Sequence, residues 1–151
     1  ELEGEFQPID ALGVRFSITQ QDPEYQNFSG SEADNTGNTI RRIPKTMARI
    51  TPTYSFMDGA GRVYFTYTYA GKRYANDENT IELPSYYKLD VGAMLDVGPW
   101  TFQVVGDNVT DEVGLTEGNP RTDVGAGGIG NIYMVRPLFG RSYMGSVTYR
   151  F

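Results

Sequence analysis

The sequence of 151 residues contains no cysteine and no histidine. Disulfide frameworks, zinc sites built from Cys and His, and mechanisms that use a histidine base are therefore excluded. Positive charge is also scarce, since the sequence has 13 Lys and Arg residues but 19 Asp and Glu residues. The net charge is therefore −6 and the pI is about 4.6. Nucleic-acid binding normally needs a basic patch or stripe, so we expect no nucleic-acid partner.

Long apolar runs are absent as well, and the mean hydropathy is −0.43. A membrane helix needs about 18 consecutive apolar residues, so a helical membrane protein is excluded. A membrane barrel is not, because polar residues occupy alternate positions along its strands. The N-terminal residues ELEGEF have neither the basic region nor the apolar core of a signal peptide. We therefore expect either a processed N-terminus or an interior piece of a longer chain.

Glycine, tyrosine and phenylalanine are abundant, with 18, 11 and 8 residues respectively. This composition favours strands and turns over helices. Apolar and polar residues alternate with a period of two along much of the chain, as in KLDVGAMLDV at 88–97, whereas helical periodicity is absent. We predict seven strands, at residues 1–6, 12–19, 45–56, 62–70, 88–97, 100–105 and 141–151.

The connections between these strands alternate strictly in length. The short ones lie at 7–11, 57–61 and 98–99, and the long ones at 20–44, 71–84 and about 107–140. All short turns then lie at one end of the sheet and all long loops at the other, as in bacterial outer-membrane barrels. The sequence therefore predicts an all-β protein, specifically a transmembrane antiparallel up-and-down β-barrel.

The two faces of the predicted strands differ in chemistry. One face is almost purely apolar or aromatic, whereas charged residues line the other, namely Arg15, Arg49, Lys88, Asp90, Asp96 and Arg150. Burying these charges in a dry core would be costly, and a water-filled lumen removes that cost. Aromatic residues gather near both ends of the strands, which suits the two interfacial girdles of a membrane barrel. Cross-strand aromatic pairing in a soluble sheet is the alternative interpretation.

Seven strands are an odd number, whereas bacterial single-chain barrels have an even one, so we expect a larger barrel. Three blocks then resemble the C-terminal end of TonB-dependent outer-membrane receptors in both order and spacing. They are LPSYYKLDVGAMLDVG at 83–98, FQVVGDNVTDE at 102–112 and RPLFGRSYMGSVTYRF at 136–151. The residues that match the family pattern are Leu83, Pro84, Tyr86, Leu89, Asp90, Asn108, Val109, Thr110, Asp111, Arg136, Pro137, Gly140, Arg141, Tyr149 and Phe151.

The resemblance implies a 22-stranded barrel with an N-terminal plug, which imports a ferric siderophore or similar nutrient using energy from the TonB complex. Residues 1–151 would supply about seven closing strands and extracellular loops, while the plug and the earlier strands lie outside this chain. Five of the charged-face residues are then expected to face the lumen and to contact the plug or channel water, namely Arg15, Arg49, Lys88, Asp90 and Asp96. Tyr149 and Phe151 resemble the signal read by the outer-membrane barrel assembly machinery. Neither a cofactor nor an enzymatic activity is expected.

Basic residues cluster where two predicted loops meet strands, namely at Arg41, Arg42, Lys45 and Arg49, and at Lys72 and Arg73. We interpret them as contacts to anionic lipopolysaccharide or as screening of neighbouring acids. The alternative is recognition of an anionic ligand such as a ferric siderophore. The possible ligand-facing loop residues are Arg41, Arg42, Tyr74, Tyr133 and Arg136.

Other candidate motifs lack the context that their chemistry needs. GAGGIG at 125–130 matches G-x-G-x-x-G, but no helix follows it, so we interpret it as loop. Asp22 with Glu24, and Asp77 with Glu78, lack the ordered spacing of a calcium loop and are interpreted as solvated charge. Two alternatives to the receptor stay open: a small passive pore or structural outer-membrane barrel, and a soluble β-sandwich ligand-binding module.

Overall fold

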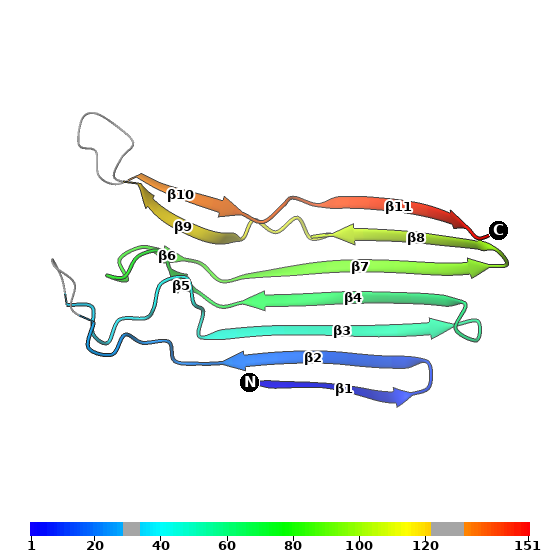
Figure 1. Cartoon of the computed structure of the whole chain (residues 1–151), viewed down its shortest axis with the longest axis horizontal. Helices are drawn as coiled ribbons and strands as arrows, with labels where there is room; N and C mark the ends of the chain where they lie inside the picture. The colour runs from blue at the N-terminus through cyan, green and yellow to red at the C-terminus, as the bar shows by residue number, and fades with distance from the viewer. Residues whose placement is uncertain (29–33, 122–131) are drawn as a thin grey trace.

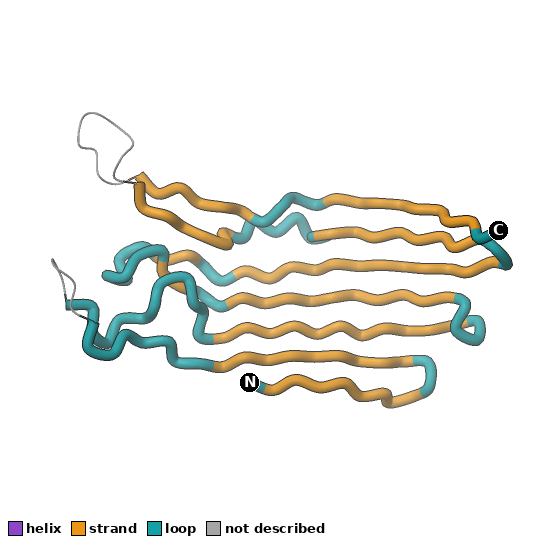
Figure 2. Tube along the Cα trace, viewed as in Figure 1, coloured by secondary structure: helices purple, strands orange, loops and turns teal. Residues whose placement is uncertain are grey.

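The computed structural model describes residues 1–28, 34–121 and 132–151, and all the regular elements in these ranges are strands (Figure 2). No helix that could span a membrane occurs in the described part of the chain. Seven strands form the main sheet: β1 (Leu2–Ile9), β2 (Leu12–Gln20), β3 (Thr46–Phe56), β4 (Gly61–Ala70), β7 (Tyr86–Val97), β8 (Trp100–Asp107) and β11 (Ser142–Tyr149).

The main sheet has the order β1-β2-β3-β4-β7-β8-β11, and every neighbouring pair is antiparallel. Figure 1 shows the tight turns of this sheet at one end and its long connections at the other. The predictions of an all-β fold, of seven long strands and of alternating connections are therefore confirmed for the main sheet, although the described residues contain four further strands outside it. The sheet is open, with β1 and β11 at its edges.

The strand register keeps one face apolar across the sheet. Phe16 in β2 lies opposite Gly4 on one side and Ile50 on the other, and the row continues through Tyr67 to Leu89. Many apolar side chains on this face are exposed, and no second layer of described residues covers them. An exposed apolar surface of this extent is typical of a protein that contacts a membrane.

The opposite face is polar and hollowed. Two adjoining hollows of about 730 and 470 Å³ share the lining residues Glu5, Arg15, Thr51 and Tyr64. All five charged residues predicted to face a lumen lie here, namely Arg15, Arg49, Lys88, Asp90 and Asp96, as the strand registers require. Their contact with a plug or with channel water stays a prediction.

Ion pairs on the polar face link neighbouring strands. The Lys88 ammonium lies 3.2 Å from an Asp90 carboxylate oxygen and 2.7 Å from one of Asp107 on β8. Arg15 and Glu5, on paired strands, approach to 3.5 Å and are both exposed. The Lys88 group is half-buried, so water screens it less than the Arg15 pair.

Aromatic rings cover glycines on the neighbouring strand. The Tyr64 ring lies across Gly92, where a Cβ atom would come within 2.3 Å of it, and the Phe56 ring lies across Gly61. An aromatic ring placed over a cross-strand glycine replaces the packing that the glycine lacks. These two glycines are therefore places where the sheet has no room for a side chain.

Two hairpins within the long connections were not predicted. β5 (Arg73–Tyr74) pairs with β6 (Glu82–Leu83), and β9 (Leu115–Arg121) pairs with β10 (Ile132–Pro137). The predicted loops at 71–84 and about 107–140 are thus partly wrong, because each contains a pair of strands. The β9 sequence LTEGNPR contains glycine and proline and does not alternate, so it lacks the usual pattern of a strand. The GAGGIG motif lies outside the described residues.

Arginine substitutions at two adjacent positions of β8 test the assignment of the faces. Val104 on the apolar face and Gln103 on the polar face are both exposed and lie near the strand centre. In the full-length protein in phospholipid vesicles, Val104→Arg should lower the free energy of unfolding by about 2–4 kcal/mol, because the guanidinium would face lipid near the bilayer centre. Denaturant titration measures this change.

Gln103→Arg is the matched control, and its effect should stay below about 1 kcal/mol because the new charge faces water. Equal losses of stability for the two variants would contradict the assigned orientation of the sheet.

Candidate functional site

The candidate site lies at the end of the sheet where the long connections emerge. Figure 1 shows β5, β6, β9 and β10 at this end, beyond the strands of the main sheet. Three connections contribute: residues 21–45, which we call the first loop; residues 71–85, the second loop, which contains β5 and β6; and the β9–β10 hairpin. They are held together mainly by polar contacts.

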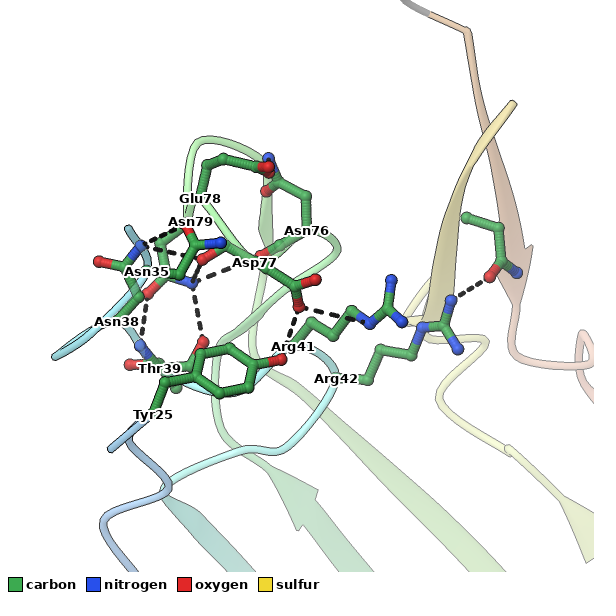
Figure 3. A network of polar contacts seen from close by, with 11 residues as sticks. Tyr25, Asn35, Asn38, Thr39, Arg41, Arg42, Asn76, Asp77, Glu78 and Asn79 are labelled. Atoms are coloured by element: carbon green, nitrogen blue, oxygen red, sulfur yellow. Dashed lines mark hydrogen bonds and ion pairs between the residues drawn. The ribbon is translucent and has the colours of Figure 1, made fainter. Parts of the chain in front are cut away.

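Asp77 in the second loop is the centre of one polar network (Figure 3). The Tyr25 hydroxyl donates a hydrogen bond of 2.6 Å to its Oδ1 atom, and the Arg41 Nε lies 3.4 Å from the same atom. Burial and the neighbouring Asp77 carboxylate raise the pKa of Tyr25. The interpretation of Asp77 as solvated loop charge is therefore wrong, because its side chain is 23% exposed and has two partners in the first loop.

Asparagine side chains join the same two loops through the main chain. The Asn79 side chain accepts a 2.7 Å hydrogen bond from the Thr39 N–H and donates a 2.8 Å bond to the Thr39 carbonyl. Asn38 donates to the Asp77 carbonyl at 2.9 Å. Asn79 has a φ of 55°, a left-handed conformation that asparagine adopts more readily than most residues. Side-chain to main-chain hydrogen bonds therefore join the two loops at these positions.

Arg42 connects all three parts of the site. Its backbone has a φ of 66°, and its N–H donates a 2.7 Å hydrogen bond to the Tyr74 carbonyl of β5. Its guanidinium contacts the Asn119 side chain in β9. One residue of the first loop thus touches both the second loop and the hairpin.

Arg73 in β5 is buried, with 3% of its surface exposed. Its guanidinium donates to the carbonyls of Leu115 at 2.5 Å and Thr116 at 3.0 Å, both in β9, and to the Gly71 carbonyl at 3.2 Å. It also lies 5.2 Å from the centre of the Tyr86 ring. The interpretation of Arg73 as a cation for lipopolysaccharide or nearby acids is not supported by this burial.

Asn108 secures the base of the third connection and is fully buried. Its N–H donates to Asp90 at 2.9 Å, and its side chain donates to the carbonyls of Glu112 and Phe139 and accepts from the Glu112 N–H. Asp111 then accepts the N–H of Arg141 at 2.9 Å, just before β11. The motif DNVTDE therefore holds the end of β8 against the start of β11.

Lysine and carboxylate pairs lie at the outer rim of the site. Lys45 is 2.5 Å from Asp22 and 3.7 Å from Glu24, and its hydrogen bond to Asp22 raises its pKa. Lys72 is 3.0 Å from Glu82. Among the residues that the structure describes, no group of three acidic side chains could hold a metal ion.

The five predicted ligand-facing residues all lie at this end of the sheet but fall into two groups. Arg41, Arg42 and Tyr74 belong to the first and second loops, whereas Tyr133 and Arg136 belong to β10. Arg136 is 73% exposed and lies 3.4 Å from Glu117 in β9. Tyr133 and Tyr74 are half-buried. Their contact with a ligand stays a prediction.

Comparisons with known proteins identify the family. Residues 1–109 match the family model described as TonB dependent receptor-like, beta-barrel, and the chain belongs to this family. The resemblance found in the sequence is thereby confirmed. Membership makes the chain part of an outer-membrane β-barrel protein.

Individual relatives agree with this assignment. The ferrioxamine receptor of Yersinia enterocolitica is 31% identical over 106 residues, which are 70% of this chain and 14% of that protein. The siderophore receptor PiuA from Acinetobacter baumannii has a TM-score of 0.74 at 21% identity. The alignment covers 96% of this chain and 20% of PiuA. BauA, the ferric preacinetobactin receptor from the same species, has a TM-score of 0.71 at 25% identity. The alignment with BauA covers 97% of this chain and 21% of BauA. The chain therefore spans 14–21% of the length of these relatives.

Replacing Asn108 tests the role assigned to the DNVTDE motif. Asn108→Ala should lower the free energy of unfolding of the full-length protein by about 2–4 kcal/mol, because three main-chain groups lose their partners at once. The exposed neighbour Thr110 provides the control, and Thr110→Ala should change this free energy by less than about 0.5 kcal/mol. Similar unfolding midpoints for the two variants would show that the buried hydrogen bonds do not support the fold.

Proposed function

We propose that this chain is the C-terminal part of an outer-membrane receptor that takes up a ferric siderophore or a similar large nutrient with energy from the TonB complex. The family match over residues 1–109 carries the proposal. The similarity to the ferrioxamine receptor and to two siderophore receptors of known structure supports the choice of substrate class. The chain would supply barrel wall and extracellular loops, while the plug and the remaining strands of a 22-stranded barrel would come from the rest of the protein.

The chemistry of the loop end agrees with this role. Arg41 is about half exposed and Arg136 mostly exposed, although each has a carboxylate partner. Both guanidinium groups are reached by solvent, so an anionic chelate can contact them beside the carboxylate that each already pairs with. Tyr74 and Tyr133 add hydrogen-bonding groups on rigid rings.

We infer three further partners from the surfaces of the sheet. The apolar face would contact the lipid of a multi-pass barrel, and Lys45 and Lys72 at its loop-end rim would face lipopolysaccharide headgroups. Both lysines line a hollow with Tyr69, whose position in the register assigns it to the apolar face. Tyr149 and Phe151 would be read by the barrel assembly machinery, which agrees with their exposure at the end of β11.

Uptake measurements test the proposed function. In a strain that lacks the gene, uptake of a panel of ⁵⁵Fe-labelled hydroxamate, catecholate and mixed siderophores should lose one saturable component, which the full-length gene restores. That component should disappear when the proton-motive force is collapsed, because active transport needs energy. A passive pore predicts instead a restored component that rises linearly with concentration and is insensitive to the uncoupler.

A further inference from the structure

We propose that Arg73 is a positioning residue, whose buried guanidinium holds the β9–β10 hairpin in the orientation that ligand binding requires. This inference rests on the proposed function, because the ligand is the chelate that the receptor takes up. Arg73 directly follows Lys72 in the sequence, where both are predicted to be surface cations, but their surroundings in the structure differ. Lys72 is exposed and paired with Glu82, whereas Arg73 is buried under the hairpin.

The partners of Arg73 explain how a charge is tolerated there. A guanidinium stays protonated in proteins, so burial does not neutralise it. Among the described residues no carboxylate pairs with Arg73, and the compensation comes from three carbonyl oxygens and the face of the Tyr86 ring. Two of these carbonyls belong to β9. The charge is therefore fully satisfied only while the hairpin is docked.

The surface under the hairpin is shaped for this close approach. A Cβ atom at Gly118 in β9 would lie 2.7 Å from the Ala75 Cβ and 3.3 Å from a Leu83 methyl carbon. Ala75 and Leu83 are the most deeply buried apolar residues of the described chain, at 0% and 1% exposure. At Gly114, a Cβ atom would meet the Tyr86 ring at 2.5 Å. The hairpin thus lies directly against the second loop, with Arg73 at the contact.

A short chain of hydrogen bonds leads from Arg73 to the exposed part of the hairpin. The Thr116 carbonyl accepts from Arg73, and the Thr116 hydroxyl donates at 2.9 Å to the carbonyl of Arg136. Arg136 and Tyr133 lie on β10 and are two of the predicted ligand-facing residues. The position of both side chains therefore depends on how β9 is held.

Hydrogen exchange of the full-length receptor tests the docking itself and needs no ligand. Arg73→Met keeps much of the side-chain length but removes the charge and the N–H donors of the guanidinium. In this variant, the backbone amides at 115–119 and 133–136 should exchange about tenfold faster than in the wild type. Amides of β7 and β8 should be unchanged. Lys72→Met is the matched control and should leave the hairpin amides as in the wild type. Unchanged hairpin exchange in Arg73→Met would overturn the proposal.

Ligand binding tests whether the docked position matters for function. With ferric ferrioxamine B and the same siderophore panel as probes, Arg73→Met should raise the Kd of the bound chelate about tenfold while leaving the maximal uptake rate within twofold. Arg73→Lys keeps the charge but lacks the planar set of N–H donors of the guanidinium, so its Kd should lie between those of the wild type and Arg73→Met.

The outcomes separate the two proposals. A wild-type Kd in Arg73→Met, combined with faster hairpin exchange, would show that the hairpin does not position the ligand, and the receptor function would stand. A wild-type protein that binds no chelate of the panel would overturn both. A parallel fall of binding and of the folded fraction in Arg73→Met, with no recovery in Arg73→Lys, would assign Arg73 a purely structural role.

Discussion

The main sheet depends on keeping its side-chain period of two in phase across seven strands. Because successive residues point to opposite faces, a slip of one residue in any strand would move its whole apolar set to the polar face. The observed register prevents this: Ile50, for example, lies opposite Phe16 on one side and Tyr67 on the other. In a bilayer the ladder also has to satisfy the main chain, since lipid offers no hydrogen bonds. Register therefore decides both solvation and backbone pairing.

The loop end is built on a different principle. Only a few apolar side chains of the described residues are buried there, and the segments are joined by polar side chains that bind the main chain of another segment. Asn79 binds Thr39, Asn108 binds Glu112 and Phe139, and Arg73 binds the start of β9. Such contacts are directional, so they define one arrangement where a small apolar core would leave several.

Sequence patterns predicted the sheet far better than the loops, for a physical reason. Strand number, order and faces follow from alternation and loop length, which are local properties. The hairpins do not, because β5 and β6 have two residues each and β9 lacks alternation. The partners of Arg73 in β9 lie 42 and 43 residues away in the sequence, and Tyr25 lies 52 residues from Asp77, so local spacing could not show that Arg73 is buried or that Asp77 is paired. Topology alone brings the five candidate ligand-facing residues to one end of the sheet.

The boundary between the two regions gives Arg73 its particular importance. Proteins open locally with free energies that depend on buried contacts and on the exposure of their hydrogen bonds. The strands of the main sheet are held by continuous ladders, whereas the separate segments of the loop end are joined mainly by side-chain hydrogen bonds, many of them only partly buried. Arg73 lies against Tyr86, which belongs to β7 and pairs with Ala70, and its other bonds reach into β9. Arg73 therefore contacts the main sheet on one side and the hairpin on the other. In this way the position of the hairpin is fixed by the barrel wall as well as by the other loops.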